Sequence, residues 1–250
     1  MTILLFVVGL LAVAFAFVGN SRAQDFFNRE PVGLAPNPQI TREAVIQVYA
    51  ARAARWRGNF GVHTWIAVKP TDAPSFTVYE VIGWYAMRGG SSLSISHRAA
   101  DGRWFGNAPW LLADKRGEGV DELIRKIDAA AHRYPYDEDY LIWPGPNSNT
   151  FTAFVLRDVP ELRVDMPPTA IGKDFIPGNV FAKTPSGTGY QVSLFGLFGV
   201  MVGLEEGVEI DLLGLTFGID PKDLALKLPL VGTVGFGDNT AKAATQTAER

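Results

Sequence analysis

The chain has 250 residues, of which 47% are hydrophobic and 20% are charged, and this balance indicates a folded protein with a hydrophobic core. Its formal net charge of -3 and the lack of a long basic stripe exclude a surface built for nucleic acid. The absence of cysteine excludes disulfides, cysteine-bound zinc and a cysteine nucleophile within this chain.

The N-terminus carries an uninterrupted apolar run from Ile3 to Val18. We expect residues 1–23 to form a hydrophobic helix that is either a signal peptide, cleaved after Ser21-Arg22-Ala23, or a membrane anchor. Arginines follow the run and none precedes it, which argues against simple export. Both interpretations stay open. They predict a cell-envelope protein, inner-membrane anchored or periplasmic, with the membrane as a partner.

Residues 24–41 are rich in Asn and Pro and predict a linker, after which residues 42–165 form the predicted α+β core. An apolar stripe predicts a helix from Arg42 to Arg57, capped by Thr41. Residues 62–68 are predicted to form a strand with residues 76–85 as its antiparallel partner, and the alternating stretch 91–97 predicts another strand. Residues 103–109 are expected to form a short strand or loop. The amphipathic stretch from Gly119 to Tyr134 predicts a second helix.

The stretch Trp143–Phe151 reads Trp-Pro-Gly-Pro-Asn-Ser-Asn-Thr-Phe, which predicts a forced turn and then a helix start near Asn147 or Ser148. Residues 166–189, rich in Pro and Gly, are expected to cross the surface. Residues 190–237 alternate between apolar and polar and predict a glycine-rich β extension of two or three strands. Residues 238–250 are expected to be a flexible tail.

Three residues are candidates for catalysis: His63 on a predicted strand, Glu80 on its antiparallel partner and Ser148 at the helix start. A nucleophile needs a base within hydrogen-bond reach, and the base needs an orienting partner. Each residue also has a purely structural interpretation. His63 can be a satisfied core residue, Ser148 a helix cap and Glu80 a solvent-facing acid.

The order of His63-x-Trp65 on a strand and Asn147-Ser148-x-Thr150-Phe151 at a helix start resembles the circularly permuted papain-like proteins. These include relatives of the NlpC/P60 peptidases and the lecithin retinol acyltransferase group. The resemblance implies that His63 is the base, that Glu80 is the orienting residue and that Ser148 replaces the family's cysteine nucleophile.

The chain is also similar to an uncharacterised bacterial envelope family of unknown function, in the stretches 61–65, 143–151 and 167–174. This resemblance covers most of residues 43 to 236 and implies no known activity.

The expected fold is therefore α+β: an antiparallel sheet with packed helices resembling a permuted papain-like core, followed by the β extension. We expect five further residues to serve binding: Asn147, Asn149, Trp65, Trp143 and Tyr79. Tyr79 alternates with Glu80, so only one of these two can face the site. The three histidines lie far apart in sequence, so we expect no metal, and no cofactor is implied.

Three functions remain open at this stage. One is a Ser148/His63 amide or ester hydrolase or acyltransferase, with oxyanion donors from the Ser148 and Asn149 backbone N–H groups. The second is an inactive binding module for a cell-wall peptide, glycan, lipid or envelope protein. The third is a structural subunit of a membrane complex that docks through residues 190–236.

Overall fold

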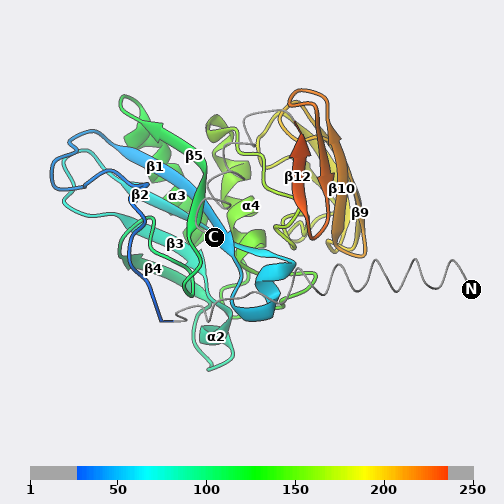
Figure 1. Ribbon diagram of the computed structural model, residues 1–250, viewed down its shortest axis with the longest axis horizontal. Coiled ribbons are helices and arrows are strands. Elements are labelled where there is room, and N and C mark those ends of the chain that lie inside the picture. The colour runs from blue at the N-terminus through cyan, green and yellow to red at the C-terminus, as the bar shows by residue number, and fades with distance from the viewer. Residues whose placement is uncertain (1–26, 236–250) are drawn as a thin grey trace, which may run out of the picture.

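The computed structural model describes residues 27–235, which form two antiparallel sheets with helix α4 between them (Figure 1). The first sheet has five strands in the order β4-β3-β2-β1-β5. Its strands are β1 (Val45–Arg52), β2 (Val62–Lys69), β3 (Thr77–Val81), β4 (Leu93–His97) and β5 (Pro109–Arg116). The predicted α+β class with an antiparallel sheet is confirmed, and the structure is richer in strands than we expected.

The predicted helix from Arg42 to Arg57, with its Thr41 cap, is wrong. The segment forms the strand β1 and then the short 3-10 helix η1 (Arg55–Asn59). β1 lies between β2 and β5, and seven of its eight residues are buried. A strand buried on both faces is apolar without strict alternation, so an apparent helical stripe arises by chance. Its β-branched and aromatic residues favour the strand.

Two helices, α3 (Val120–His132) and α4 (Ser148–Asp158), cover one face of this sheet. α3 confirms the helix predicted at 119–134. The main hydrophobic core lies between the helices and the sheet and contains Ile46, Ile66, Ile127, Phe151 and Leu156, each fully buried. Burial of each of these side chains contributes about 1.5–3 kcal/mol, which fixes α4 against the sheet.

The opposite face of the same sheet carries a second, aromatic-rich core that includes Tyr49, Trp65 and Trp104. Residues 27–41, predicted to be a linker, run along this face, and Leu34 and Ala35 pack against it. Asp101 fixes them there, because its Oδ2 accepts hydrogen bonds from the backbone N–H groups of Leu34 and Ala35 at 2.6 and 3.2 Å.

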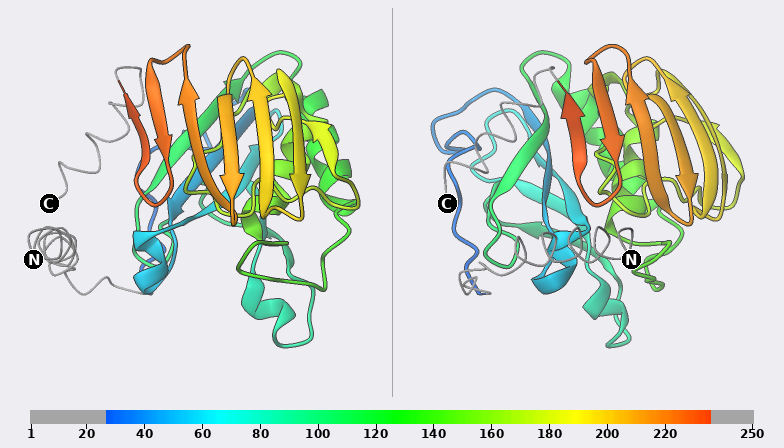
Figure 2. Two further views of the ribbon diagram at one scale, coloured as in Figure 1. Left: turned by 90° about the vertical axis from the view of Figure 1, so that its right-hand side faces the viewer. Right: turned by 45° about the vertical axis from the view of Figure 1, so that its right-hand side comes forward.

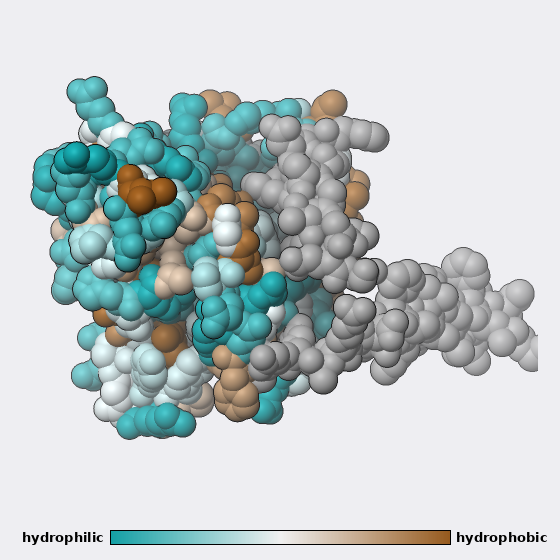
Figure 3. Space-filling model, turned by 60° about the vertical axis from the view of Figure 1, so that its left-hand side comes forward, coloured by the Kyte–Doolittle hydropathy of each residue, from teal (hydrophilic) through white to brown (hydrophobic). Residues whose placement is uncertain are grey.

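The side of the molecule seen in Figure 3 is mainly hydrophilic, with scattered hydrophobic side chains.

The C-terminal region forms a seven-stranded sheet in the order β12-β11-β10-β9-β8-β7-β6 (Figure 2). Its strands are β6 (Phe181–Lys183), β7 (Gly189–Leu194), β8 (Phe198–Gly203), β9 (Gly207–Leu212), β10 (Leu215–Asp220), β11 (Ala225–Leu228) and β12 (Gly232–Gly235). Six of them follow residue 188, where we expected two or three. The extra strands are short and are joined by tight turns such as Leu213-Gly214, in which both residues have positive φ.

The inner face of this sheet is charged. The Lys173 ammonium lies 2.6 Å from Glu209 Oε2 and 2.8 Å from Asp174 Oδ1. Lys227 contacts Glu209 Oε1 and Asp165 Oδ1, each at 2.7 Å. This buried chain of alternating charges joins the sheet to the segment between α4 and β6, and each ion is stable there only because it is paired.

The predicted N-terminal hydrophobic helix and the C-terminal tail lie outside the described residues. Within residues 27–235, none of the helices has the length and apolar character needed to cross a membrane.

Candidate functional site

A cavity of 450 Å³ opens at the end of the five-stranded sheet where β2 begins and β3 ends. Its wall draws residues from η1, from β2, from the short helix α2 (Gly83–Ala86) and from the start of α4. His63, Asn147, Ser148, Asn149 and Trp143 all line it. Five of the eight predicted site residues, distant in sequence, therefore share one cavity with a largely apolar wall.

His63 is the second residue of β2 and is 5% exposed. Its Nε2 lies 2.9 Å from Glu80 Oε2 on β3, and its ring stacks on Trp104 with centroids 3.7 Å apart and planes at 11°. β2 and β3 are antiparallel neighbours, which places the two side chains on the same face of the sheet. Glu80 therefore holds the imidazole in one orientation, and Trp104 covers the flat side of the ring.

Arg98 completes this group, and the sequence analysis missed it. Its guanidinium donates to Glu80 Oε1 from Nε at 3.2 Å and from Nη2 at 3.0 Å, while His63 occupies the other oxygen. The available signal was a basic residue directly after the predicted strand 91–97, beside the strand of Glu80. Both carboxylate oxygens are thus satisfied although Glu80 is buried, as a buried charge requires.

The charge states follow from this pairing. Burial acts to raise the pKa of Glu80, but the hydrogen bond from His63 and the positive charge of Arg98 outweigh it, so the pKa is lowered and Glu80 is ionised. Burial lowers the pKa of His63 by more than Glu80 raises it, so the imidazole is neutral at pH 7. An ionised carboxylate only accepts, so Nε2 carries the proton and Nδ1 keeps a free lone pair.

The start of α4 is built around Asn147, which is the N-cap. Its Oδ1 accepts hydrogen bonds from the backbone N–H groups of Asn149 and Thr150 at 2.9 and 3.2 Å, and the Asn147 N–H donates to Thr150 Oγ1 at 3.2 Å. This capping box satisfies the first turn. Ser148 is therefore not the cap, and helix capping does not account for its hydroxyl.

The neighbouring polar side chains tie α4 to two other segments. Asn149 Nδ2 donates to the carbonyls of Val62 and Ile171 at 3.0 and 2.8 Å, and Thr150 Oγ1 donates to the Gly172 carbonyl at 2.7 Å. Gly172 has φ of 97°, and a Cβ there would collide with the Asn147 amide. Among residues 147–150, only Ser148 shows no side-chain hydrogen bond to another described residue.

Ser148 and His63 share the cavity, but no hydrogen bond joins them in the described structure. The side chain of Thr64 points toward α4, where its hydroxyl donates to Asn149 Oδ1 at 3.0 Å. Side chains alternate along a strand, so His63 projects from the opposite face, toward Trp104. A contact between His63 and Ser148 would therefore have to pass around the end of the sheet.

One predicted oxyanion donor is wrong. The Asn149 N–H already donates to Asn147 Oδ1, so it is not available to a substrate oxygen.

Two predicted binding residues lie away from the cavity. Trp65 is fully buried and donates from Nε1 to the Ala100 carbonyl at 2.8 Å. Tyr79 faces the main core, and its hydroxyl donates to Asp128 Oδ1 at 2.9 Å on α3. Side chains alternate along β3, and because Glu80 points to the cavity side, Tyr79 points to the main core. Trp143 lies at the mouth, where its Nε1 donates to the Leu213 carbonyl at 3.0 Å.

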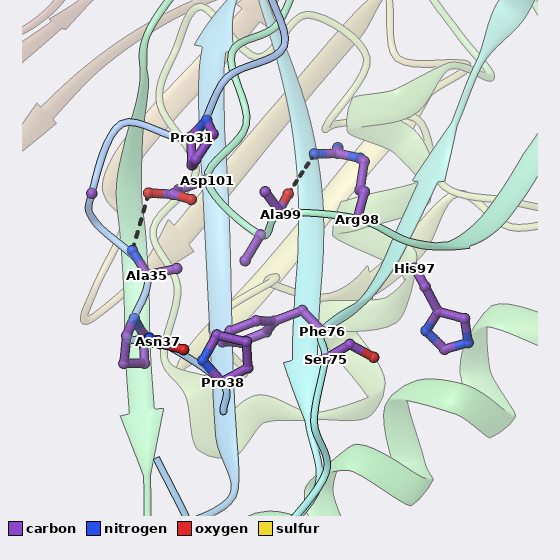
Figure 4. Close-up of a pocket in the computed structure, with 13 residues that line it drawn as sticks. Pro31, Ala35, Asn37, Pro38, Ser75, Phe76, His97, Arg98, Ala99 and Asp101 are labelled. Carbon is purple, nitrogen blue, oxygen red and sulfur yellow. Dashed lines mark hydrogen bonds between the residues drawn. The ribbon is translucent and has the colours of Figure 1, made fainter. Parts of the chain in front are cut away.

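A second cavity, of 580 Å³, lies between residues 31–38 and the end of β4 (Figure 4). Three of its polar side chains bond to the protein itself: Asp101 to the backbone of Ala35, Arg98 to the Ala99 carbonyl at 3.0 Å and His97 to Thr77 at 3.3 Å. We therefore interpret this cavity as a packing gap between residues 31–38 and the five-stranded sheet. In the part of the chain that the structure describes, no group of three His, Asp or Glu residues is placed to hold a metal ion.

Comparison with protein families finds a match over the first part of the described chain. The family described as "Protein of unknown function (DUF3750)" matches residues 43–175, over half of the chain. The match contains His63, Glu80, Arg98 and Ser148 and ends before the seven-stranded sheet. Searches of curated proteins and of solved structures found no match. The prediction of a family of unknown function is confirmed, and the papain-like resemblance stays a prediction.

Proposed function

The chain belongs to the DUF3750 family, and we propose that its cavity is the active site of an amide or ester hydrolase or acyltransferase. His63 is the general base, Glu80 and Arg98 position it, and Ser148 is the nucleophile. One observation carries the proposal: a buried histidine held through Nε2 by a buried carboxylate lines the same cavity as a serine at a helix start.

The chemistry follows the usual order for acyl transfer. Nδ1 of His63 accepts the proton of the Ser148 hydroxyl as Oγ forms a bond to the substrate carbonyl carbon. The imidazolium formed is stabilised by Glu80, and it returns the proton to the leaving amine or alkoxide when that bond breaks. Water or an acceptor alcohol then releases the acyl group by the same steps in reverse. The Ser148 N–H and the positive end of α4 favour the oxyanion.

The step needs Ser148 Oγ within hydrogen-bond reach of Nδ1, about 3 Å. Catalytic contacts in unliganded sites are often long and tighten when the substrate binds. The proposal therefore requires the substrate to bring the two groups together around the end of β2.

A fluorophosphonate probe tests this proposal. We expect covalent labelling of Ser148 that disappears in Ser148→Ala and falls at least about 100-fold in His63→Ala, because general-base help contributes 10²–10⁴-fold. Ser91→Ala and His97→Ala remove an exposed serine and an exposed histidine as controls and leave labelling unchanged. Labelling of the wild type that is absent, or that survives in His63→Ala, contradicts the proposal.

A second candidate is a binding module without turnover, for a cell-wall peptide, glycan, lipid or envelope protein. Its support is the placement of His63 on the sheet face opposite α4, which keeps base and nucleophile apart. A wall-peptide fragment that raises Tm, in the absence of any probe labelling, favours this function. Trp143→Ala then weakens binding.

We also propose that the protein resides in the cell envelope. The support is the apolar run Ile3–Val18 and the small residues around Ala23. The mass of the protein extracted from its own cells separates the two forms: an N-terminus at Gln24 indicates cleavage, and an intact chain that sediments with membranes indicates an anchor. An intact chain in the soluble fraction contradicts both.

A further inference from the structure

The outer face of the seven-stranded sheet is covered with apolar side chains. Every second residue of each strand points outward, and most of these residues are 38–57% exposed. The outward residues are Phe181, Tyr190, Val192, Leu194, Phe198, Val200, Val202, Val208, Ile210, Leu212, Leu215, Phe217, Ile219, Leu226, Leu228 and Val234, with Lys183 at the β6 edge. We call this set the apolar face.

The apolar face is one of two chemically distinct sides of the seven-stranded sheet. The alternate residues of the same strands, such as Glu209 and Lys227, form the buried charged layer on the inner side. Seven strands spaced about 4.8 Å apart and about six residues long give a face of roughly 600 Å². That is the upper end of the patches seen on monomers, and such patches mark interaction sites.

We propose that a second copy of this chain covers the apolar face, through face-to-face packing of the two seven-stranded sheets about a two-fold axis. Two copies would bury about 1,200 Å² together, which meets the size of a specific interface. Twisted sheets of the same hand pack on each other at about -30°, with interdigitated β-branched and aromatic side chains. A two-fold axis sets the same face against itself, and because the face is almost free of charge, no cluster of like charges opposes this packing.

The other occupants fit less well. A planar bilayer touches only part of a twisted sheet, whereas another sheet with the same twist follows it across all strands (Figure 2). The apolar run 3–18 has 16 residues, and even as a helix about 24 Å long and 10 Å wide it would cover less than half of the face. Residues 238–250 are polar.

A cysteine placed at the centre of the face tests the proposal, because the chain has no cysteine of its own. Ile210 lies in the middle of β9, the central strand. In full-length protein treated in intact cells with a short membrane-permeant bismaleimide, Ile210→Cys is expected to give a cross-linked dimer. Met87→Cys, on the loop after α2, is 74% exposed against 47% for Ile210 and is expected to stay monomeric. Equal cross-linking at both positions, or none at Ile210→Cys, overturns the proposal.

A charge at the same position gives a second measurement. In sedimentation equilibrium, Ile210→Glu is expected to raise the dimer dissociation constant at least about 100-fold, because it buries an unpaired charge, while circular dichroism and Tm show that the chain still folds. A wild-type chain that is monomeric throughout overturns the proposal. So does loss of vesicle flotation in Ile210→Glu without any change in sedimentation, since that result assigns the face to lipid.

Discussion

The two sheets of this protein solve burial in opposite ways. The five-stranded sheet has apolar side chains on both faces and is enclosed by helices on one side and by residues 27–41 on the other. The seven-stranded sheet turns charged residues inward, where Glu209 joins Lys173 to Lys227, and turns aliphatic residues outward. Both faces of the first sheet are covered by other parts of the same chain. The second satisfies its charges internally but leaves its apolar surface exposed.

The comparison predicts its largest effect at Glu209. Glu209→Leu leaves Lys173 and Lys227 buried with half of their compensation and is expected to lower the free energy of unfolding by about 3–5 kcal/mol. The exposed Glu122–Arg125 pair on α3 is the control, and Glu122→Gln is expected to cost under about 1 kcal/mol. Urea denaturation measures both. Equal losses would show that the charged layer does not hold the second sheet.

The next effect contrasts the same residue type on the two kinds of surface. Ile127→Ala on α3 removes a fully buried side chain and is expected to cost about 2–5 kcal/mol. Ile219→Ala on the apolar face, 53% exposed, is expected to change the stability of the monomer by less than about 0.5 kcal/mol. Urea denaturation at low protein concentration compares them. A cost at Ile219 that matches the cost at Ile127 would mean that the face is covered within the chain.

The sequence predicted a helix or strand correctly where its hydrophobic pattern fits only one kind of secondary structure. The amphipathic helix α3 was predicted because one of its faces is regularly apolar. β1 and β2 are both buried on both faces, so neither shows the alternation of a half-buried strand. β2 was still predicted because Val, Thr, Trp and Ile dominate it, whereas the spacing of Ala44, Val45, Val48 and Ala51 made β1 resemble a helix. The seven-stranded sheet was predicted as strands, but the alternation of Val208-Glu209-Ile210-Asp211 cannot say which face points inward. The buried ion pairs of Lys173 and Lys227 with Glu209 show that the charged side points inward.

The site was predictable to the same limited degree. The order of His63, Glu80 and Ser148 along the chain predicted that they lie close together. In the structure His63 is hydrogen-bonded to Glu80 and lines the same cavity as Ser148. Arg98 was missed because a lone arginine after a strand has many other uses. Tyr79 was misplaced because the face toward which a strand residue points depends on where the helices pack. Trp65 lies on the same face as His63, but it is fully buried in the aromatic-rich core and does not reach the cavity.

Acidification is expected to expose the buried histidine. The pKa of His63 is lowered in the fold, so its contribution is full above about pH 6.5 and is lost as pH falls through the folded pKa. The loss is about 1.4 kcal/mol for each unit by which the pKa is lowered. Burial raises the pKa values of Asp165 and Asp211, with the opposite effect on the slope, so the measured quantity is the difference between wild type and His63→Gln in Tm between pH 7 and 5. Parallel curves would contradict the neutral, buried state.

The smallest effect separates capping from chemistry at the start of α4. Asn147→Ala removes the N-cap and its bonds to the Ile142 and Ile171 carbonyls, and is expected to cost about 1–2 kcal/mol. Ser148→Ala removes a hydroxyl that bonds to no other described residue and is expected to cost less than about 0.5 kcal/mol. Thermal denaturation distinguishes the two. A larger loss in Ser148→Ala would make the serine structural.

The protonation state of His63 is the central claim, and nitrogen-15 NMR of the imidazole rings measures it directly. The chain has three histidines, so His97→Asn and His132→Asn assign the signals. At pH 7 the account predicts a neutral ring with the proton on Nε2 and a bare Nδ1, titrating below the usual pKa, and an upward shift of that pKa in Arg98→Gln. A protonated ring at pH 7, or a proton on Nδ1, would contradict the general-base role and leave the cavity as a binding site.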